Sequence, residues 1–266
     1  MNNKRVNNSK TSSKKLNHKK QAKRKTKKLI AKIVCLTLVM LMLIGQIRVA
    51  FANPSFIVCI DPGHQAKGDP KTEPSAPGSG ARKARVSSGT SGVATKNPEY
   101  KVNLEAGLIL EEMLKQKGYE VVMTRKTNEV NISNAERAQV ANNAKANMTI
   151  RLHCDSIDNG GKTGAVILIP AKTSKYTQGI YEASEKYATM LKASLSEAGV
   201  KVNGIFERSD MTGFNYSTVP VVILEMGFMS NWNEDKMLGS KEYQTKLMSA
   251  VTKSMEQYQK ETSKVN

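Results

Sequence analysis

The amino-acid sequence predicts a single α/β domain with a mostly parallel, six-stranded sheet covered by helices on both faces. A disordered basic tail and one apolar membrane or signal segment precede it. Three observations support this fold class. Apolar strand candidates alternate with helical patterns from residue 53 onward. The strand candidates are continuously apolar, as strands buried on both faces are. The 266 residues are 39% hydrophobic and 24% charged, which suits one good core.

The N-terminal tail, residues 1–28, carries most of the charge. Residues 1–52 contain 14 Lys or Arg and no Asp or Glu, so the net charge of +18 falls to +4 over the rest of the chain. The basicity therefore indicates a cytoplasmic tail rather than a nucleic-acid-binding domain. Because this tail has few apolar residues to offset its chain entropy, we expect it to be disordered.

An almost unbroken apolar run, residues 33–47, follows the tail and ends near Ala50-Phe51-Ala52. That tripeptide has the small-x-small form of a signal-peptidase site. The run is shorter than a full span of about 20 residues, so we expect residues 29–52 to be a signal peptide or a membrane anchor. In both cases residues 53–266 are exported. The alternative is a nucleic-acid-binding tail beside a buried core helix.

Strands and helices are predicted in turn along residues 53–266. Short apolar runs predict strands at 56–60, 120–124, 148–152, 164–169, 200–206 and 219–225, of which 200–206 is the weakest. Apolar residues at helical spacing predict helices at 98–117, 134–143, 180–196 and 243–260. Ser133 to Glu136 fit a capping box, and Gly118 and Gly199 stand where helix ends favour glycine.

Residues 66–97 interrupt this alternation. They are rich in Gly, Pro, Ser and Lys and contain no convincing strand or helix, which is long for a connection inside a compact domain. Because the segment directly follows His64, we expect a long loop that forms part of a binding surface; disorder is the alternative.

His64 and His153 are the only histidines of the exported part. Each falls at the carboxyl end of an apolar strand, where open α/β sheets place their ligand sites. Either one alone is as well explained by a structural role. Two at equivalent strand ends favour a shared site. Cys154 could also bind a metal, but a neighbour in a strand points to the opposite face.

Two glutamates are candidates for the same site. Glu99 lies on the apolar stripe of the first helix, where a carboxylate is costly unless paired or metal-bound; a favourable interaction with the helix dipole is the alternative. Glu225 closes the last apolar strand, so burial is expected to raise its pKa toward the range of a general base. The alternative is an ion pair with Arg125 or Arg151.

Two imidazoles and one carboxylate are a ligand set of catalytic zinc, which leaves the fourth position for water. A nearby glutamate that is not a ligand can take the proton from that water. The chain has no His-Glu-x-x-His motif to place two ligands on one helix. The spacing alone therefore gives a weak prediction of zinc.

Five blocks of sequence make the prediction specific. From about residue 57 to residue 258 the chain resembles the zinc-dependent N-acetylmuramoyl-L-alanine amidases of bacterial cell walls, the amidase type 3 family. The matching blocks, in order, are "IDPGHQ", "PEYKVNLEAGLILEEMLKQKGYEVVMTR", "ISNAERAQVAN", "IRLHCDS" and "VPVVILEMGFMSN". Together they cover nearly the whole exported domain.

This resemblance implies a role for each candidate residue. His64, Glu99 and His153 match the ligands of one zinc ion, and Glu225 matches the catalytic glutamate. The implied substrate is peptidoglycan, cut at the amide between N-acetylmuramic acid and the L-alanine of the stem peptide. Asp61 is a candidate to orient an imidazole.

The chain departs from the family at two places. Arg151 stands where a serine is more usual, which changes the surroundings of His153. Gln65 and the long polar loop replace Gly-Gly and a short turn. Both departures bear on substrate preference.

Two other functions remain open at this point. The domain could be a zinc peptidase acting within the stem peptide, or a non-catalytic wall-binding or regulatory protein of the same fold. Because no wall-binding module is visible, we expect targeting by the membrane segment or by an activating or targeting partner protein. A role in spore germination is a further hypothesis.

Overall fold

The computed structural model describes residues 27–30, 32–37 and 56–264. The chain divides into two units, Met1–Pro54 and Ser55–Asn266. In the first unit, residues 27–30 and 32–37 are helical and exposed; most of the tail and the Ala50-Phe51-Ala52 motif lie outside the described residues. None of the described helices combines the length and the apolar character needed to cross a bilayer. The signal or anchor segment therefore stays a prediction.

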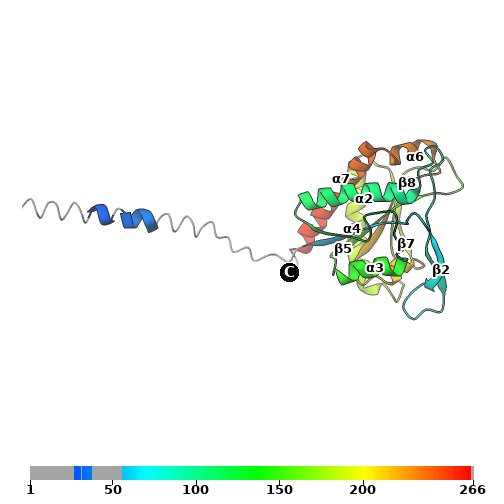
Figure 1. Cartoon of the computed structure of the whole chain (residues 1–266), viewed down its shortest axis with the longest axis horizontal. Helices are drawn as coiled ribbons and strands as arrows, with labels where there is room; N and C mark the ends of the chain where they lie inside the picture. The colour runs from blue at the N-terminus through cyan, green and yellow to red at the C-terminus, as the bar shows by residue number, and fades with distance from the viewer. Residues whose placement is uncertain (1–26, 31, 38–55, 265–266) are drawn as a thin grey trace, which may run out of the picture. The chain divides into compact units, whose positions relative to one another are not determined.

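Six strands of the second unit form one sheet in the order β4-β1-β5-β8-β6-β7 (Figure 1). Neighbouring strands are parallel except β6 and β8, which are antiparallel. This confirms the predicted six-stranded, mostly parallel sheet. The strands are β1 (Ile57–Pro62), β4 (Glu120–Met123), β5 (Met148–Asp155), β6 (Ala165–Pro170), β7 (Val202–Arg208) and β8 (Val221–Phe228).

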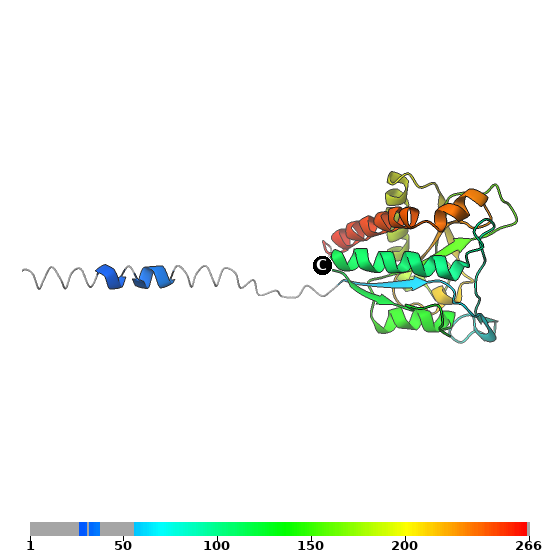
Figure 2. The ribbon, with the colours of Figure 1, turned by 45° about the horizontal axis from the view of Figure 1, so that its top comes forward.

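Helices cover both faces of the sheet, as predicted. One face carries α2 (Glu99–Gln116), α4 (Gln178–Glu197) and α7 (Lys241–Thr262), and the other carries α3 (Asn134–Asn143) and α5 (Thr212–Asn215). Figure 2 shows α2 and α7 running side by side, with α3 beyond the other side of the sheet. The short helices α5 and α6 (Trp232–Leu238) were not predicted, since so few residues give no helical period.

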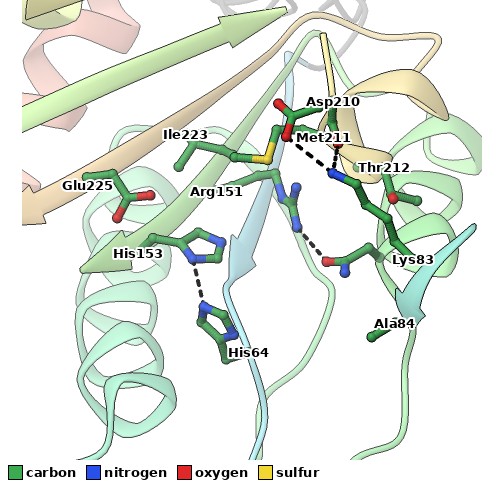
Figure 3. A pocket seen from close by; sticks show the side chains of 12 residues that line it. His64, Lys83, Ala84, Arg151, His153, Asp210, Met211, Thr212, Ile223 and Glu225 are labelled. Carbon is green, nitrogen blue, oxygen red and sulfur yellow. Dashed lines mark hydrogen bonds and ion pairs between the residues drawn. The ribbon is translucent and has the colours of Figure 1, made fainter. Parts of the chain in front are cut away.

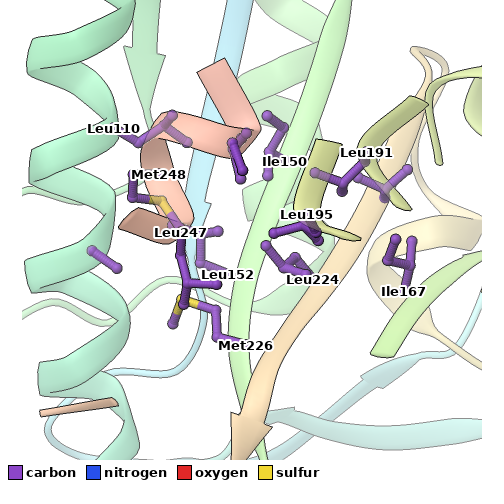
Figure 4. Packing of buried hydrophobic residues seen from close by; sticks show 14 of the residues in the cluster. Leu110, Ile150, Leu152, Ile167, Leu191, Leu195, Leu224, Met226, Leu247 and Met248 are labelled. Carbon is purple, nitrogen blue, oxygen red and sulfur yellow. The ribbon is translucent and has the colours of Figure 1, made fainter. Parts of the chain in front are cut away.

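The larger core lies between the sheet and helices α2, α4 and α7. Alternate residues of each strand point into it, including Leu152 of β5 and Leu224 of β8, and meet Leu110 of α2 and Leu247 of α7 (Figure 4). The residues between them along the strands point to the face of α3 and α5. Polar side chains of β1, β5 and β8 on that second face form the candidate site.

Local sequence signals account for several helix ends. Ser133 and Glu136 form the predicted capping box at the start of α3. Gly118 and Gly199 follow α2 and α4 with positive φ angles of 86° and 70°, which glycine adopts without strain. Helix α2 begins at Glu99 with Pro98 as its N-cap, so the first helical residue is the predicted glutamate itself.

The segment 66–97, expected to lack regular structure, contains a β-hairpin. Strands β2 (Asp69–Pro74) and β3 (Arg82–Val86) pair in antiparallel fashion in a sheet of their own. The prediction failed because these strands are polar and mostly exposed, and therefore carry no apolar signal.

Two contacts fix the hairpin segment to the rest of the domain. Lys83 of β3 donates to the main-chain carbonyl and the carboxylate of Asp210, which follows β7. Farther along, the buried carboxylate of Asp235 in α6 accepts from the main-chain N–H groups of Ala94 and Thr95 at 2.7 and 2.6 Å. These contacts connect the hairpin segment to the residue Asp210 after β7 and to helix α6.

Candidate metal centre

The turn after β1 is held by two buried arginines. Arg125 donates to the carbonyl oxygens of Pro62 and Gly63 at 2.9 and 3.0 Å. Arg137 donates to those of Pro62 and His64 at 2.9 and 2.8 Å. The two side chains are 3% and 1% exposed, so these bonds form away from competing water. They fix the backbone that presents His64.

The backbone is unusual at both Gly63 and His64. Gly63 has no room for a side chain, and His64 has a positive φ angle. A Cβ atom on Gly63 would lie 2.2 Å from Cε1 of His153, so glycine is needed for the imidazole to approach. His64 itself has a φ of 62°, which is uncommon for a residue with a side chain. The arginine clamp sustains this conformation and directs the ring toward His153.

His64, Glu99 and His153 come together at the carboxyl edge of the sheet. His64 Nε2 lies 3.2 Å from Glu99 Oε1 and 3.1 Å from His153 Nδ1, and His153 Nδ1 lies 3.3 Å from Glu99 Oε1. Figure 3 shows the two imidazoles facing each other. His64 follows the end of β1, whereas His153 lies within β5, because that strand runs to Asp155.

The hairpin segment orients the His64 ring. Nδ1 of His64 donates to the carbonyl oxygen of Ser87 at 3.1 Å and lies 2.9 Å from its hydroxyl oxygen. A proton on Nδ1 leaves the lone pair of Nε2 directed at Glu99 and His153. Residues just after β3 therefore form part of the site, in line with the expectation for residues 66–97.

Three hydrogen bonds fix the Glu99 carboxylate. Its Oε1 accepts from Asn103 and from the Cys154 N–H at 3.2 and 3.1 Å, and its Oε2 accepts from the Thr90 N–H at 3.1 Å. Burial alone would raise the pKa of Glu99, but the neighbouring imidazoles of His153 and His64 lower it below its usual range. Glu99 is therefore ionised at neutral pH.

The three residues fit a metal ion. Their ligand atoms all lie within 4.8 Å of one another. Burial lowers the pKa of His153 to about 4, so its imidazole is neutral and able to bind a metal at pH 7. His153 Nε2 is also buried without a hydrogen-bond partner among the described residues. Two imidazoles and one carboxylate suit a transition metal of the zinc type.

Glu225 lies beside His153 on the neighbouring strand. The register of β5 and β8 pairs the two residues directly, and Figure 3 shows both side chains at the same pocket. Burial raises the pKa of the Glu225 carboxyl well above its usual range, and the negative charges of Glu99 and Asp155 raise it further. Among residues 56–264, no ion pair or hydrogen bond reaches this carboxylate.

Asp61 and Arg151 lie next to the cluster and bind each other. Arg151 Nε donates to Asp61 Oδ2 at 2.7 Å, and Arg137 and Thr124 donate to Asp61 Oδ1 at 2.8 and 2.6 Å. The partners of the Asp61 carboxylate are thus arginines and a hydroxyl instead of an imidazole. Since Arg151 is bound to Asp61, it does not form the ion pair with Glu225 that the sequence left open.

A pocket of about 270 Å³ opens beside the cluster. Its walls come from β5, β8, the hairpin strand β3 and the segment from Asp210 to Gly213. His64, His153 and Glu225 lie on its surface (Figure 3), whereas Glu99 is not among the residues that line it. A substrate in this pocket would meet the two imidazoles and the free carboxylate together.

Several residues that shape the site were not found by sequence reasoning. Asn103 stands one helical turn after Glu99, a spacing that could have indicated a contact. The hairpin residues and the arginine Arg137 gave no signal, because their partners are distant in sequence or are main-chain atoms. They are Ser87, Gly89, Thr90, Asn103 and Arg137.

An α/β domain with two imidazoles and a carboxylate at the carboxyl edge of its sheet, and a free carboxylate beside them, is typical of metal-dependent hydrolases. The sequence pattern of one family narrows this class: the family described as N-acetylmuramoyl-L-alanine amidase matches residues 58–257. The chain belongs to this family.

Curated proteins and solved structures agree with this assignment. The chain is 28% identical over 219 residues to an N-acetylmuramoyl-L-alanine amidase of Mycobacterium tuberculosis, a match that covers 78% of this chain and 89% of that protein. It is 25% identical over 222 residues to the germination-specific N-acetylmuramoyl-L-alanine amidase of Bacillus subtilis, covering 76% and 79%.

Among solved structures, the apo form of the N-acetylmuramyl-L-alanine amidase Ami1 from Mycobacterium abscessus superposes with a TM-score of 0.69 at 27% identity, covering 76% of this chain and 97% of that one. The CwlD amidase of Clostridioides difficile, solved in complex with the GerS lipoprotein, shares the fold with a TM-score of 0.62 at 19% identity, covering 77% and 99%.

Proposed function

We propose that the chain is a zinc-dependent peptidoglycan amidase that cuts the amide between N-acetylmuramic acid and the L-alanine of the stem peptide. The observation that carries this proposal is the meeting of His64, Glu99 and His153 within 4.8 Å, with Glu225 beside them, in a member of the amidase family. The three clustered residues would hold one zinc ion.

When bound, zinc supplies Lewis-acid polarisation of the amide carbonyl and activates water near neutral pH. Glu225 takes a proton from the attacking water, whose oxygen adds to the lactyl carbonyl carbon. The carbon–nitrogen bond then breaks, and Glu225 delivers the proton to the departing alanine nitrogen. Burial raises the pKa of the Glu225 carboxyl, which makes its carboxylate a stronger base toward the attacking water.

The remaining residues hold these groups in position. Ser87 orients the ring of His64, and Asn103 and the Cys154 N–H orient the Glu99 carboxylate. The buried arginines fix the turn that carries His64. Such supporting contacts keep metal ligands in one geometry and raise metal affinity.

The domain is proposed to act outside the cytoplasm, where peptidoglycan lies, after export by residues 29–52. An activating or targeting partner protein stays a prediction. The germination-specific relative makes the spore cortex one candidate substrate, and the vegetative wall is the other.

Digestion of purified peptidoglycan tests this function. We expect the zinc-loaded protein to release stem peptides with a new L-alanine amino terminus, detected by amino-group labelling and mass spectrometry. The metal-free protein serves as the control and should release none. New amino termini on residues within the stem peptide would instead identify a peptidase, and binding without any cleavage would identify a non-catalytic wall protein.

A further inference from the structure

Arg151 presents a positive charge to the pocket that the proposed reaction does not use. It stands two residues before His153 on β5, so both side chains point to the same face of the sheet. Its side chain is 7% exposed and lines the same pocket as His64, His153 and Glu225 (Figure 3). A guanidinium buried to this extent needs hydrogen-bond partners.

Not every nitrogen atom of this guanidinium forms a hydrogen bond with the described residues. Nε donates to Asp61 at 2.7 Å and Nη2 donates to Asn134 at 3.2 Å. Within residues 56–264, no hydrogen bond is formed by Nη1. A Cβ atom on Gly213 would lie 2.1 Å from Nη1, so the glycine makes room for the guanidinium against helix α5. At least one pair of N–H groups is therefore free for a ligand.

Positive charge is in excess around Arg151. Asp61 is shared between Arg151 and Arg137, while Arg125 donates to carbonyl and amide oxygens. Two buried guanidinium groups thus share one carboxylate, and Arg125, the third, has no acidic hydrogen-bond partner among the described residues. Two acids also line the pocket, and neither binds Arg151: the register places Glu225 beside His153, and Asp210 is paired with Lys83 and Arg208. This wall of the pocket suits an anion.

We propose that Arg151 binds a carboxylate of the stem peptide and selects substrates whose second residue keeps its α-carboxylate free, over those in which it is amidated. This inference rests on the proposed amidase function. On the sugar side, the lactyl carboxyl is consumed in the scissile amide, so the anionic groups of the substrate belong to the peptide.

The distances agree with this assignment. Two residues along a strand span about 7 Å, which separates the backbone of Arg151 from that of His153. Two residues of extended peptide span about the same length. A peptide that places its scissile amide at His153 can therefore place its second residue at Arg151.

Two muramoyl tripeptides test the inference: N-acetylmuramoyl-L-Ala-γ-D-Glu-L-Lys and its α-amide, N-acetylmuramoyl-L-Ala-D-isoglutaminyl-L-Lys. We expect the zinc-loaded full chain to cleave the acid with a kcat/KM about 10- to 100-fold higher, the range of a charge-assisted hydrogen bond. Calorimetry with the released tripeptides and metal-free protein gives a readout independent of activity, and the acid should again bind more tightly.

Three variants connect this preference to the guanidinium. Arg151→Gln should lower kcat/KM for the acid far more than that for the amide, so that the preference between the two is lost. Gly213→Ala keeps the charge but displaces Nη1, and should reduce the preference as well. Lys253→Gln removes an exposed positive charge on helix α7 and is the matched control, which should keep the full preference. Circular dichroism and zinc content verify that each variant is folded.

Equal cleavage and equal binding of acid and amide by the unaltered chain would overturn the inference while the amidase function stands. An equal loss on both substrates in Arg151→Gln would also overturn it, since Arg151 would then only support the fold through Asp61. Failure to cleave either tripeptide or purified peptidoglycan would overturn the proposed function itself.

Discussion

Three buried or partly buried carboxylates of the site have pKa values shifted in different directions because their neighbours differ. The arginines beside Asp61 and the imidazoles beside Glu99 lower the pKa values of these carboxylates despite burial. Glu225 has no such donor, and burial raises its pKa. Carboxylates whose surroundings separate their pKa values in this way divide the roles of ligand and proton carrier.

Replacing Glu225 with Gln tests whether Glu225 transfers the proton in the proposed reaction. The amide has nearly the same shape but cannot accept and return a proton, so we expect kcat to fall by about 10²- to 10⁴-fold. Zinc content should stay at the level of the unaltered chain, because Glu225 is not among the three clustered residues. Release of stem peptide at a near-normal rate would exclude this role for Glu225.

Gly63→Ala tests the close approach of His153 to the turn. The added Cβ atom would overlap the imidazole, so the ring must shift and zinc affinity should fall by about 10-fold or more. Gly80→Ala is a suitable control, since a Cβ atom there meets nothing within 4 Å. Competition with a chromogenic chelator measures both affinities. Equal zinc affinities of Gly63→Ala and Gly80→Ala would show that the turn tolerates a side chain at position 63.

The sequence predicted the residues that gather at the site better than the residues that support them. His64 and Glu99 stand at the ends of elements, whereas His153 and Glu225 lie within β5 and β8, which run past the predicted strand ends. All four belong to elements with strong apolar patterns, so their common edge follows from the fold class. The ion pairs between Asp61 and its arginine partners were not predicted, because ion pairs between residues distant in sequence leave no local pattern. Nη1 of Arg151 forms no hydrogen bond with the described residues, and this could be recognised only from the positions of its neighbours in the structure.

At the scale of elements, β1, β5 and α3 are connected through one buried carboxylate. Asp61, the residue before the last of β1, binds Arg151 of β5 and Arg137 of α3, with both arginine side chains at most 7% exposed. Because the carboxylate is surrounded by these groups, removing its charge leaves two buried guanidinium groups without an ionic partner. This connection stabilises the edge that carries the site.

Asp61→Asn tests that connection. Breaking a buried ion pair on one side costs about 3–5 kcal/mol, so we expect a free energy of unfolding lower by about that amount at pH 7. Since the folded state lowers the pKa of Asp61, its contribution is present above the unfolded pKa of about 4 and decreases at lower pH. Urea unfolding at a series of pH values measures both effects. A difference that does not depend on pH would contradict this origin.

The hairpin shows where element prediction fails. Strands β2 and β3 are held by their mutual pairing and by contacts such as Lys83 with Asp210, instead of by an apolar face. The six strands of the main sheet were predicted because each is apolar, with end points that differ from the prediction by at most three residues. A polar hairpin has no comparable signal, although its position after His64 correctly indicated part of the site surface.

At the scale of the whole molecule, the charge distribution separates two parts of the chain. The basic residues 1–52 precede a catalytic unit that is close to neutral overall. A basic flank followed by an apolar run directs the flank to the cytoplasm. Residues 53–266 are therefore predicted to lie on the side of the membrane where peptidoglycan is found.

Protease accessibility in spheroplasts tests this arrangement. Protease added from outside should degrade the catalytic unit, or find it already released into the medium, while a cytoplasmic marker protein remains intact. A version with Lys32 and the preceding basic residues exchanged for Gln is expected to export less efficiently. Full protection of the catalytic unit in intact spheroplasts would contradict export.

The central claim is that side chains far apart in sequence meet around one divalent cation. Isothermal titration of the metal-free chain with zinc, combined with elemental analysis, measures this most directly. We expect one zinc ion per chain, and loss of that binding in His64→Ala and His153→Ala. Absence of stoichiometric zinc, or unchanged binding in both variants, would contradict it.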